Sequence, residues 1–261
     1  MKRITSKDNS ALKHISKLIK SSSFRRDNHA FVCEGLRLCE DALLSEREII
    51  SLAVSDSALS KHGEIIARLS DRAGEVYSLP DSLFNKISDT KSPQGILCVI
   101  KTLDNPSLFD KIKCNGKFLA LENIQDPVNL GTVLRTAEAL GIDGIILSSD
   151  CCDIYSPKVV RGSMGAVFRL SYTVVDSIAD FIKTLDGVKS YAAVVDRNAD
   201  KLTALDFSDH ASVVCVGNEG NGLTARLIEA CDKSFTIPMA GRAESLNAAI
   251  AAGIIMWEMM K

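Results

Sequence analysis

Short apolar runs of strand length recur through the C-terminal half of the chain, at residues 118–121, 144–147, 191–195, 213–216 and 235–237. Neighbouring positions within each run are apolar, which is typical of strands buried on both faces of a parallel sheet. Helical patterns lie between the runs, notably at 130–140 before Gly141 and at 223–231. This alternation predicts an α/β domain with a mostly parallel sheet.

The first hundred residues show a second, smaller alternation of helical and extended patterns. A helix is expected at 35–44 with Leu36, Cys39 and Leu43 on one face, and strands at 50–54 and 95–100. This half therefore predicts a small α/β unit.

Between the two patterns, Asn-Pro, scattered lysines and Asn-Gly occur with little periodicity, which is typical of a linker. The predicted organisation is an N-terminal domain at 1–104, a linker at 105–116 and a C-terminal domain at 117–261.

Composition places the chain among ordinary globular proteins, with 46% apolar and 25% charged residues. The basic N-terminus reaches no apolar signal region, and the most apolar stretch, 248–257, is too short to span a bilayer, so no membrane partner is expected. The eight cysteines form no CxxC pair and have no nearby histidine partners, so no metal site is predicted. Cys98 and Cys215 lie in apolar runs and are interpreted as core residues, with reduced thiols and a cytoplasmic location.

Charge is uneven although the net value is only −2. Residues 1–27 carry eight Lys or Arg and two Asp, a balance of +6, which leaves −8 for the rest. The basic segment fits a solvated helical arm and a nucleic-acid contact equally well. Because the pI is near 6.1, any RNA contact must come from a local patch.

Ligands of parallel sheets bind beyond the carboxyl ends of the strands, so the segments after the apolar runs are the candidate site. In the first, Asp126-Pro127 marks a turn, and Asn129 is expected to cap a helix beginning at Leu130. Arg135 falls on the side of that helix away from its apolar stripe. Taken alone, this pattern also fits a capped surface helix.

Two further segments are rich in small residues. RGSMGA, at 161–166, permits close backbone approach but also fits an ordinary tight turn. GNEGNG, at 217–222, has glycines in the order GxxGxG, which differs from the GxGxxG of a dinucleotide site, and it lacks the Gly-Lys-Ser/Thr of a P-loop. Glu219 at its centre argues against a bound phosphate, so a neutral or cationic ligand is expected.

The last segment places Ser245 and Asn247 at the mouth of an apolar helix, with Ser245 as a possible N-cap. The apolar positions of this helix are Leu246, Ile250, Gly253 and Trp257, and a late apolar helix is usually part of the core.

Together and in this order, the segments resemble the three motifs of the SpoU (TrmH-like) family of RNA ribose 2′-O-methyltransferases in the SPOUT superfamily. The first motif is carried by Asn129, Gly131, Arg135 and Ala137, the second by RGSMGA, and the third by GNEGNG with IPMAGRAESLN. Residues 117–261 match closely, and residues 3–100 resemble more loosely the L30-like substrate-binding domain of the family. Ala248 stands where the family often has Val.

The resemblance implies a C-terminal domain with a deep trefoil knot, an exception to the rule that chains do not thread loops. It also implies S-adenosylmethionine bound in that knot, and a homodimer formed through the knot domain. The implied cofactor contacts are backbone groups of Gly217, Ile237 and Leu246, with Asn218, Gly220 and Met239 close by.

For catalysis, the resemblance implies that Arg135 acts as the base. Because arginine stays protonated, we favour instead a role in which it binds a phosphate and stabilises developing oxyanion charge. Asn129 would orient Arg135 or the ribose, and Glu219, Ser245 and Asn247 would hold the loops and the substrate.

The implied function is S-adenosylmethionine-dependent 2′-O-methylation of RNA, with 23S rRNA favoured over tRNA by the N-terminal resemblance. The alternatives are a tRNA ribose methyltransferase and a non-catalytic RNA-binding factor that retains the fold. Base methylation fits the motifs less well, and a dinucleotide oxidoreductase is disfavoured by the glycine order.

Overall fold

The computed structural model describes residues 1–103 and 115–261, which form two compact units. Unit 1 comprises Met1–Leu103 and Asp153–Phe168. Unit 2 comprises the described residues 115–152 together with Arg169–Lys261. Most of the linker predicted at 105–116 lies outside the described residues. Within those described, no helix is both long and apolar enough to cross a membrane.

Unit 1 is built on a five-stranded sheet with the order β1-β4-β3-β5-β2. β1, β4 and β3 run parallel, while β5 is antiparallel to both β3 and β2. The strands are β1 (Lys2–Arg3), β2 (Ala30–Glu34), β3 (Ile49–Ser55), β4 (Ala73–Leu79) and β5 (Ile96–Lys101). The predicted strands at 50–54 and 95–100 are therefore confirmed within a residue or two.

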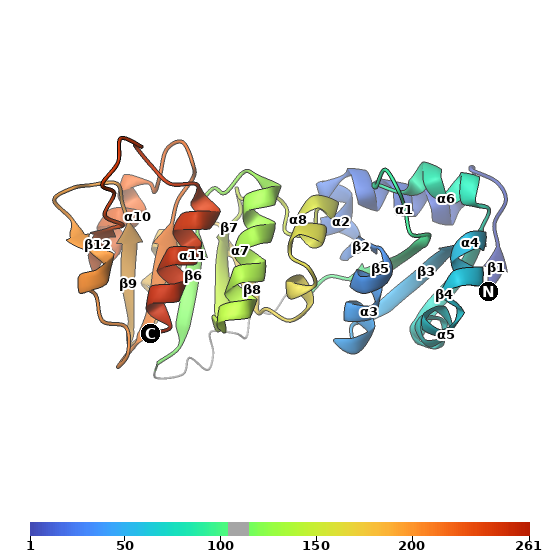
Figure 1. Ribbon diagram of the computed structural model, residues 1–261, viewed down its shortest axis with the longest axis horizontal. Coiled ribbons are helices and arrows are strands. Elements are labelled where there is room, and N and C mark those ends of the chain that lie inside the picture. Colours follow the sequence, from blue (N-terminus) through green and yellow to red (C-terminus); the bar gives the residue numbers. More distant parts are fainter. Residues whose placement is uncertain (104–114) are drawn as a thin grey trace. The chain divides into compact units, whose positions relative to one another are not determined.

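Helices cover both faces of this sheet (Figure 1). On one face, the amphipathic α1 buries Leu12, Ile15 and Leu18 in a core cluster that also holds Phe84 of α6 and Val99 of β5. The other face carries α3 and α5. The helices are α1 (Ser10–Lys20), α2 (Ser22–Asn28), α3 (Leu36–Leu44), α4 (Asp56–Lys61), α5 (Gly63–Arg72) and α6 (Asp81–Ile87).

The buried face of α3 differs from the one predicted. Leu38, Cys39 and Ala42 are its buried residues, whereas Leu36 and Leu43 are only half-buried. The prediction of Cys39 is confirmed, but the stripe is rotated because α3 must cover two neighbouring strands.

The segment 153–168 contains α8 (Pro157–Gly162) and the short helix η2 (Ala166–Phe168), and it packs within unit 1. Arg25, which is 5% exposed, forms an ion pair of 2.6 Å with Asp153 and donates to the Leu18 carbonyl. The ring of Phe31 stacks on Tyr155 at 4.4 Å between centroids. A buried ion pair and an aromatic stack therefore fix this segment, which includes the RGSMGA motif, onto unit 1.

Unit 2 is built on a seven-stranded sheet with the order β10-β12-β9-β11-β6-β7-β8, in which every pairing is parallel. The strands are β6 (Lys117–Leu121), β7 (Gly144–Ser148), β8 (Tyr172–Val175), β9 (Val188–Ala193), β10 (Asp200–Lys201), β11 (Ala211–Val216) and β12 (Lys233–Thr236). β6, β7 and β11 are buried along their whole length, as their continuous apolarity predicts. β9 ends two residues before the predicted limit, and Val195 is 71% exposed.

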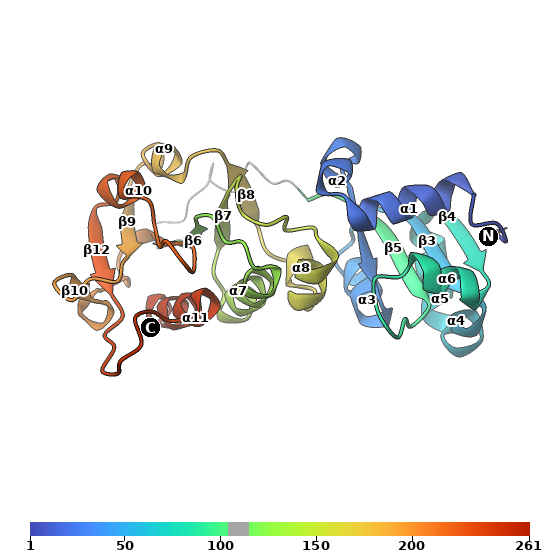
Figure 2. The same cartoon turned by 90° about the horizontal axis from the view of Figure 1, so that it is seen from above.

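Two helices lie on each face of this sheet. α7 (Pro127–Leu140) and α11 (Ala248–Met259) cover one face, and α9 (Ile178–Ile182) and α10 (Ala225–Ala230) cover the other, as Figure 2 shows. The short helix η3 (Leu202–Ala204) follows β10. Leu130, Val133, Leu134 and Ala137 of α7 are buried as predicted.

Three details of these helices correct the sequence interpretation. α7 begins at Pro127 with Asp126 as its N-cap, so Asn129 lies inside the first turn, because proline is well suited to the first helical position. Asn247, not Ser245, caps α11. The face of α11 with Ile250 and Trp257 is not core: these side chains are 55% and 60% exposed, because its alanines and Ile255, Met256 and Met259 face the sheet.

Candidate functional site

A pocket of about 490 Å³ opens at the carboxyl edge of the sheet in unit 2. The last residues of three neighbouring strands, Ala193, Val216 and Thr236, form part of its wall. This is the edge at which parallel α/β sheets bind ligands. All six residues predicted to contact a cofactor line it: Gly217, Asn218, Gly220, Ile237, Met239 and Leu246.

The loop after β11 is held in a tight, self-bonded turn. Asn218 and Gly222 exchange backbone hydrogen bonds of 3.1 and 2.9 Å, and the Asn218 side chain accepts from Gly220 N at 2.8 Å. Its amide also donates to the Asn123 carbonyl at 2.8 Å, which ties the turn to the loop after β6. A Cβ on Gly217 would lie 2.2 Å from the Gly222 carbonyl carbon, so only glycine fits there.

A polar network joins three segments beside this loop. Asn129 of α7, which is 7% exposed, donates from Nδ2 to Glu219 Oε1 at 2.5 Å. Its Oδ1 accepts from Asn247 Nδ2 at 3.0 Å. The Oδ1 of Asn247 in turn accepts from the backbone N–H groups of Ala249 and Ile250 and so caps α11.

The donors and acceptors of this network fix one another. A carboxylate only accepts hydrogen bonds, so the Asn129 amide must present its NH₂ to Glu219 and its oxygen to Asn247. Asn247 must then direct its own oxygen at the helix terminus. One buried side chain therefore sets the positions of the GNEGNG loop and of the α11 start together.

The charge around the pocket is negative. Of the side chains that line it, only those of Glu219 and Glu244 are ionisable, and both are acids. Such a lining repels phosphate groups and favours a neutral or cationic ligand. The same kind of ligand is expected from the sequence, because Glu219 lies at the centre of GNEGNG.

The remaining predicted residues lie outside the network. Ser245 lines the pocket and is exposed. Arg135 is exposed on α7, does not line the pocket, and forms no hydrogen bond or ion pair with residues 1–103 or 115–261. The structure thus brings together Asn129, Glu219 and Asn247, but not Arg135.

Two further residues of the candidate site are not identified from the sequence. Asn123, which adopts a left-handed conformation (φ 55°), holds the Asn218 side chain, and Glu244 adds a second acid to the pocket. Asn123 lies two residues after the apolar run at 118–121, so the rule that sites lie beyond strand ends could have found it. Glu244 has no such signal, because it lies in an irregular loop.

A parallel sheet with a pocket at its carboxyl edge, joined in one chain to a smaller α/β unit, defines a two-domain α/β protein with a small-molecule-sized site. Residues 116–257 match the model of the SpoU rRNA Methylase family, and residues 9–98 match that of the MRM3-like substrate binding domain. The chain belongs to the SpoU rRNA methylase family and is a methyltransferase.

Relatives of known name resemble the chain along its whole length. The chain is 31% identical over 261 residues to the 23S rRNA (guanosine(2553)-2′-O)-methyltransferase RlmP of Bacillus subtilis, covering 99% of both chains. It is also 31% identical to an uncharacterized tRNA/rRNA methyltransferase of Synechocystis, covering 98% of this chain and 92% of the relative.

Among solved structures, the AdoMet-bound rRNA methyltransferase from Sinorhizobium meliloti superposes with a TM-score of 0.89 and 31% identity, covering 99% of this chain and 97% of the other. The predicted fold class, an N-terminal substrate-binding domain with a C-terminal SPOUT-type α/β methyltransferase domain, is confirmed.

Proposed function

We propose that the protein transfers a methyl group from S-adenosylmethionine to a ribose 2′-hydroxyl of ribosomal RNA, with 23S rRNA as the substrate. The observation that carries the proposal is the acidic pocket at the carboxyl edge of the sheet in unit 2, beside which a buried network holds the motif residues in place. The named activity of the Bacillus relative supports the choice of substrate. A cytoplasmic location belongs to the same proposal and is supported by the bacterial rRNA methyltransferase among the relatives.

The pocket fits S-adenosylmethionine by size and by charge. Its volume of about 490 Å³ falls within the roughly 300–1,000 Å³ usual for small-molecule sites. Its two acids, Glu219 and Glu244, suit a cofactor that carries a positive sulfonium and no phosphate. When bound, the cofactor supplies an electrophilic methyl group.

The residues around the pocket would bind and orient. Backbone groups of Gly217, Ile237 and Leu246 would hold the cofactor, and the Asn129 network would keep their loops in register. In-line placement of the reacting atoms contributes much of the rate of a group transfer. By fixing both loops, the Asn129 side chain would help to keep the reacting atoms aligned. The deep trefoil knot implied by the family belongs to this same proposal.

Arg135 is proposed to bind a phosphate of the RNA next to the target ribose. Its side chain is exposed and has no partner among the described residues, so it is available to a ligand. A guanidinium stays protonated and can stabilise the negative charge that develops as the hydroxyl loses its proton.

The test of this role is the variant Arg135→Ala, which should lose methyl transfer while the affinity for S-adenosylmethionine stays unchanged. Arg135→Lys keeps the charge but loses the two-pronged geometry, and it should recover part of the activity. Transfer at the wild-type rate by Arg135→Ala would exclude the role.

RNA would also contact a basic groove of unit 1, which we call the lysine groove. It has a volume of about 490 Å³ between α1 and α6 and an apolar floor that includes Leu12, Leu83 and Ile87. Its charged wall consists of Lys7, Lys13, Lys17, Lys20 and Lys86. Successive lysines of α1 lie roughly 4.5–6 Å apart along the helix axis, which suits a row of phosphates.

We further propose a homodimer formed through unit 2. Ile250, Ile254 and Trp257 lie four and three residues apart on the outer side of α11, and their exposed fractions are 55%, 40% and 60%. Val128 of the adjoining α7 is 62% exposed. Apolar surface of this kind marks an interaction site, and Arg135 shares helix α7 with it.

Trp257→Glu should convert the dimer into a monomer in analytical ultracentrifugation, because a charge cannot be buried there without a partner. Val174→Glu, at a 51% exposed apolar position on β8, is the matched control and should leave the dimer intact. A wild-type monomer that methylates RNA would contradict the dimer.

The function itself is tested by mapping 2′-O-methylation of rRNA and tRNA from cells with and without the protein. Loss of one ribose methylation in 23S rRNA is expected. Loss of a ribose methylation in tRNA alone would show that tRNA is the substrate. No lost methylation, together with no binding of S-adenosylmethionine by calorimetry, would leave the non-catalytic RNA-binding factor.

A further inference from the structure

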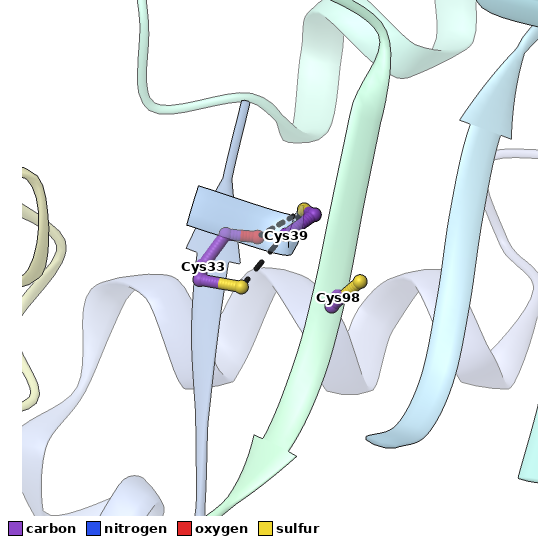
Figure 3. Close-up of side chains that lie close together, drawn as sticks. All are labelled: Cys33, Cys39 and Cys98. Carbon is purple, nitrogen blue, oxygen red and sulfur yellow. Dashed lines mark hydrogen bonds between the residues drawn. The ribbon is translucent and has the colours of Figure 1, made fainter. Parts of the chain in front are cut away.

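Three cysteines from different elements meet inside unit 1, and one of them, Cys98, comes from a distant part of the sequence. Cys33 on β2 and Cys98 on β5 are direct cross-strand partners, and Cys39 comes from α3, which packs on that face of the sheet. Figure 3 shows the three side chains close together, with dashed lines between Cys33 and Cys39. Each is 0% exposed, and their sulfur atoms all lie within 4.8 Å of one another.

The spacing of these sulfurs matches that of ligands around one metal ion. Sulfur atoms bound at about 2.3 Å from a metal lie roughly 3.8–4.0 Å apart in tetrahedral or trigonal arrangements. The Cys33 and Cys39 sulfurs are 3.9 Å apart. The Cys98 sulfur lies within 4.8 Å of both of these sulfurs, so the three form a triangle close to that spacing.

The ligand set selects the kind of ion. Thiolates favour soft ions, namely Cu(I), zinc and the irons of iron–sulfur clusters. Structural zinc and iron–sulfur sites use four protein ligands. In residues 1–103 and 115–261, no fourth histidine, cysteine or carboxylate belongs to the group, and none of its three side chains is exposed to bulk solvent.

We propose that Cys33, Cys39 and Cys98 form a three-sulfur binding site for one Cu(I) ion, separate from the methyl-transfer site. On binding, the ion forms bonds to three sulfurs, two thiol protons leave to solvent, and the third sulfur coordinates as a thiol. The site then carries a net charge of −1, whereas three thiolates would give −2. The apolar surroundings favour the smaller charge. No oxidation state changes. Because the site is sealed, the ion enters during folding or through local opening.

The test is an anaerobic titration of the full-length protein with Cu(I) in competition with a coloured Cu(I) chelator. We expect one bound ion, sulfur-to-copper charge-transfer absorption in the ultraviolet, and an X-ray absorption spectrum with three sulfur ligands. Bound Cu(I) should also raise the midpoint of thermal unfolding, since it binds the folded state. These wild-type measurements do not depend on how any variant folds.

Cys39→Ala and Cys98→Ala each remove one ligand from a different element and should weaken Cu(I) binding by roughly tenfold or more. Cys215→Ala is the matched control: it removes another buried thiol, 3.8 Å from the Cys231 sulfur in unit 2, and should keep the site. Wild-type protein that cannot compete with the chelator, unchanged affinity in both ligand variants, or tighter binding of zinc at the same sulfurs would overturn the proposal.

Discussion

Two cavities of the same volume, about 490 Å³, carry opposite charges in the two units. The pocket of unit 2 contains two acids among mostly uncharged residues, while the lysine groove of unit 1 has five lysines over an apolar floor. Volume therefore does not distinguish the ligands of the two sites, whereas charge does. One site suits a cationic small molecule, and the other suits a polyanion.

The two cavities also differ in how they are held. Around the pocket, a tight turn and the Asn129 network leave little freedom, which suits the alignment of reacting atoms. In the groove, Lys13 pairs with Asp8 at 3.1 Å and Lys17 lies over the Phe24 ring, while the other lysines end in solvent. Mobile charges suffice to bind phosphates without reading a sequence.

The largest expected effect tests the rigidity of the pocket. Gly217→Ala places a methyl group against the Gly222 backbone, which cannot move without opening the turn, so S-adenosylmethionine binding should fall roughly a hundredfold. Calorimetry measures this affinity, and RNA affinity should stay unchanged.

The matched control is Gly241→Ala in the loop before α11, which does not line the pocket and where an added Cβ would meet no atom within 4 Å. It should change cofactor affinity by less than about threefold. Equal losses in both variants would show that the turn is not the rigid element.

The next effect concerns the network. Asn129→Ala leaves Glu219 and Asn247 without their shared partner, at a cost of about 1–3 kcal/mol, so kcat/KM should fall roughly tenfold or more. Thr132→Ala, at an exposed position of the same helix, is the control and should retain activity. If steady-state kinetics gave the two variants the same rate, the network would have no part in positioning the loops.

A smaller effect is expected from the lysine groove. Replacing Lys13, Lys17 and Lys20 by Gln should weaken RNA binding about fivefold and flatten its logarithmic salt dependence by about 0.7–0.9 per lysine in contact. The affinity for S-adenosylmethionine should not change. Fluorescence anisotropy over a salt series measures both quantities.

The control for the groove removes an equal charge from unit 2, where Lys183, Lys189 and Lys233 are exposed. Their replacement by Gln should leave the salt dependence as in the wild type. The same flattening in both triple variants would mean that net charge, and not the groove, attracts RNA.

How far the sequence predicts this molecule depends on the range of the interactions involved. The buried parallel strands of unit 2 follow from local apolar runs, and the pocket follows from the rule that places sites beyond strand ends. The hydrogen bonds of Asn129 to Glu219 and Asn247 span 90 and 118 residues, so no local pattern contains them. Cys33 and Cys98 are likewise joined only by strand pairing.

The outer face of α11 shows a different limit. Apolar residues occur on every side of helix α11, so periodicity cannot distinguish the face that covers the sheet from the face that carries Ile250 and Trp257. Packing against β11 and α7 decides this, and it depends on tertiary structure.

The smallest expected effect compares the helix caps of the two units. Asp126 accepts from Val128 N at the start of α7, and Asn9 accepts from Ala11 N at the start of α1. Each substitution to Ala should lower the free energy of unfolding by about 1 kcal/mol.

The two variants should differ in binding. Asp126→Ala should weaken cofactor binding, because α7 carries Asn129. Asn9→Ala should weaken only RNA binding, because α1 carries the lysines. Denaturant unfolding and the two binding assays separate these outcomes. Cofactor affinity lost in Asn9→Ala would show that the two units do not divide the work as their charges indicate.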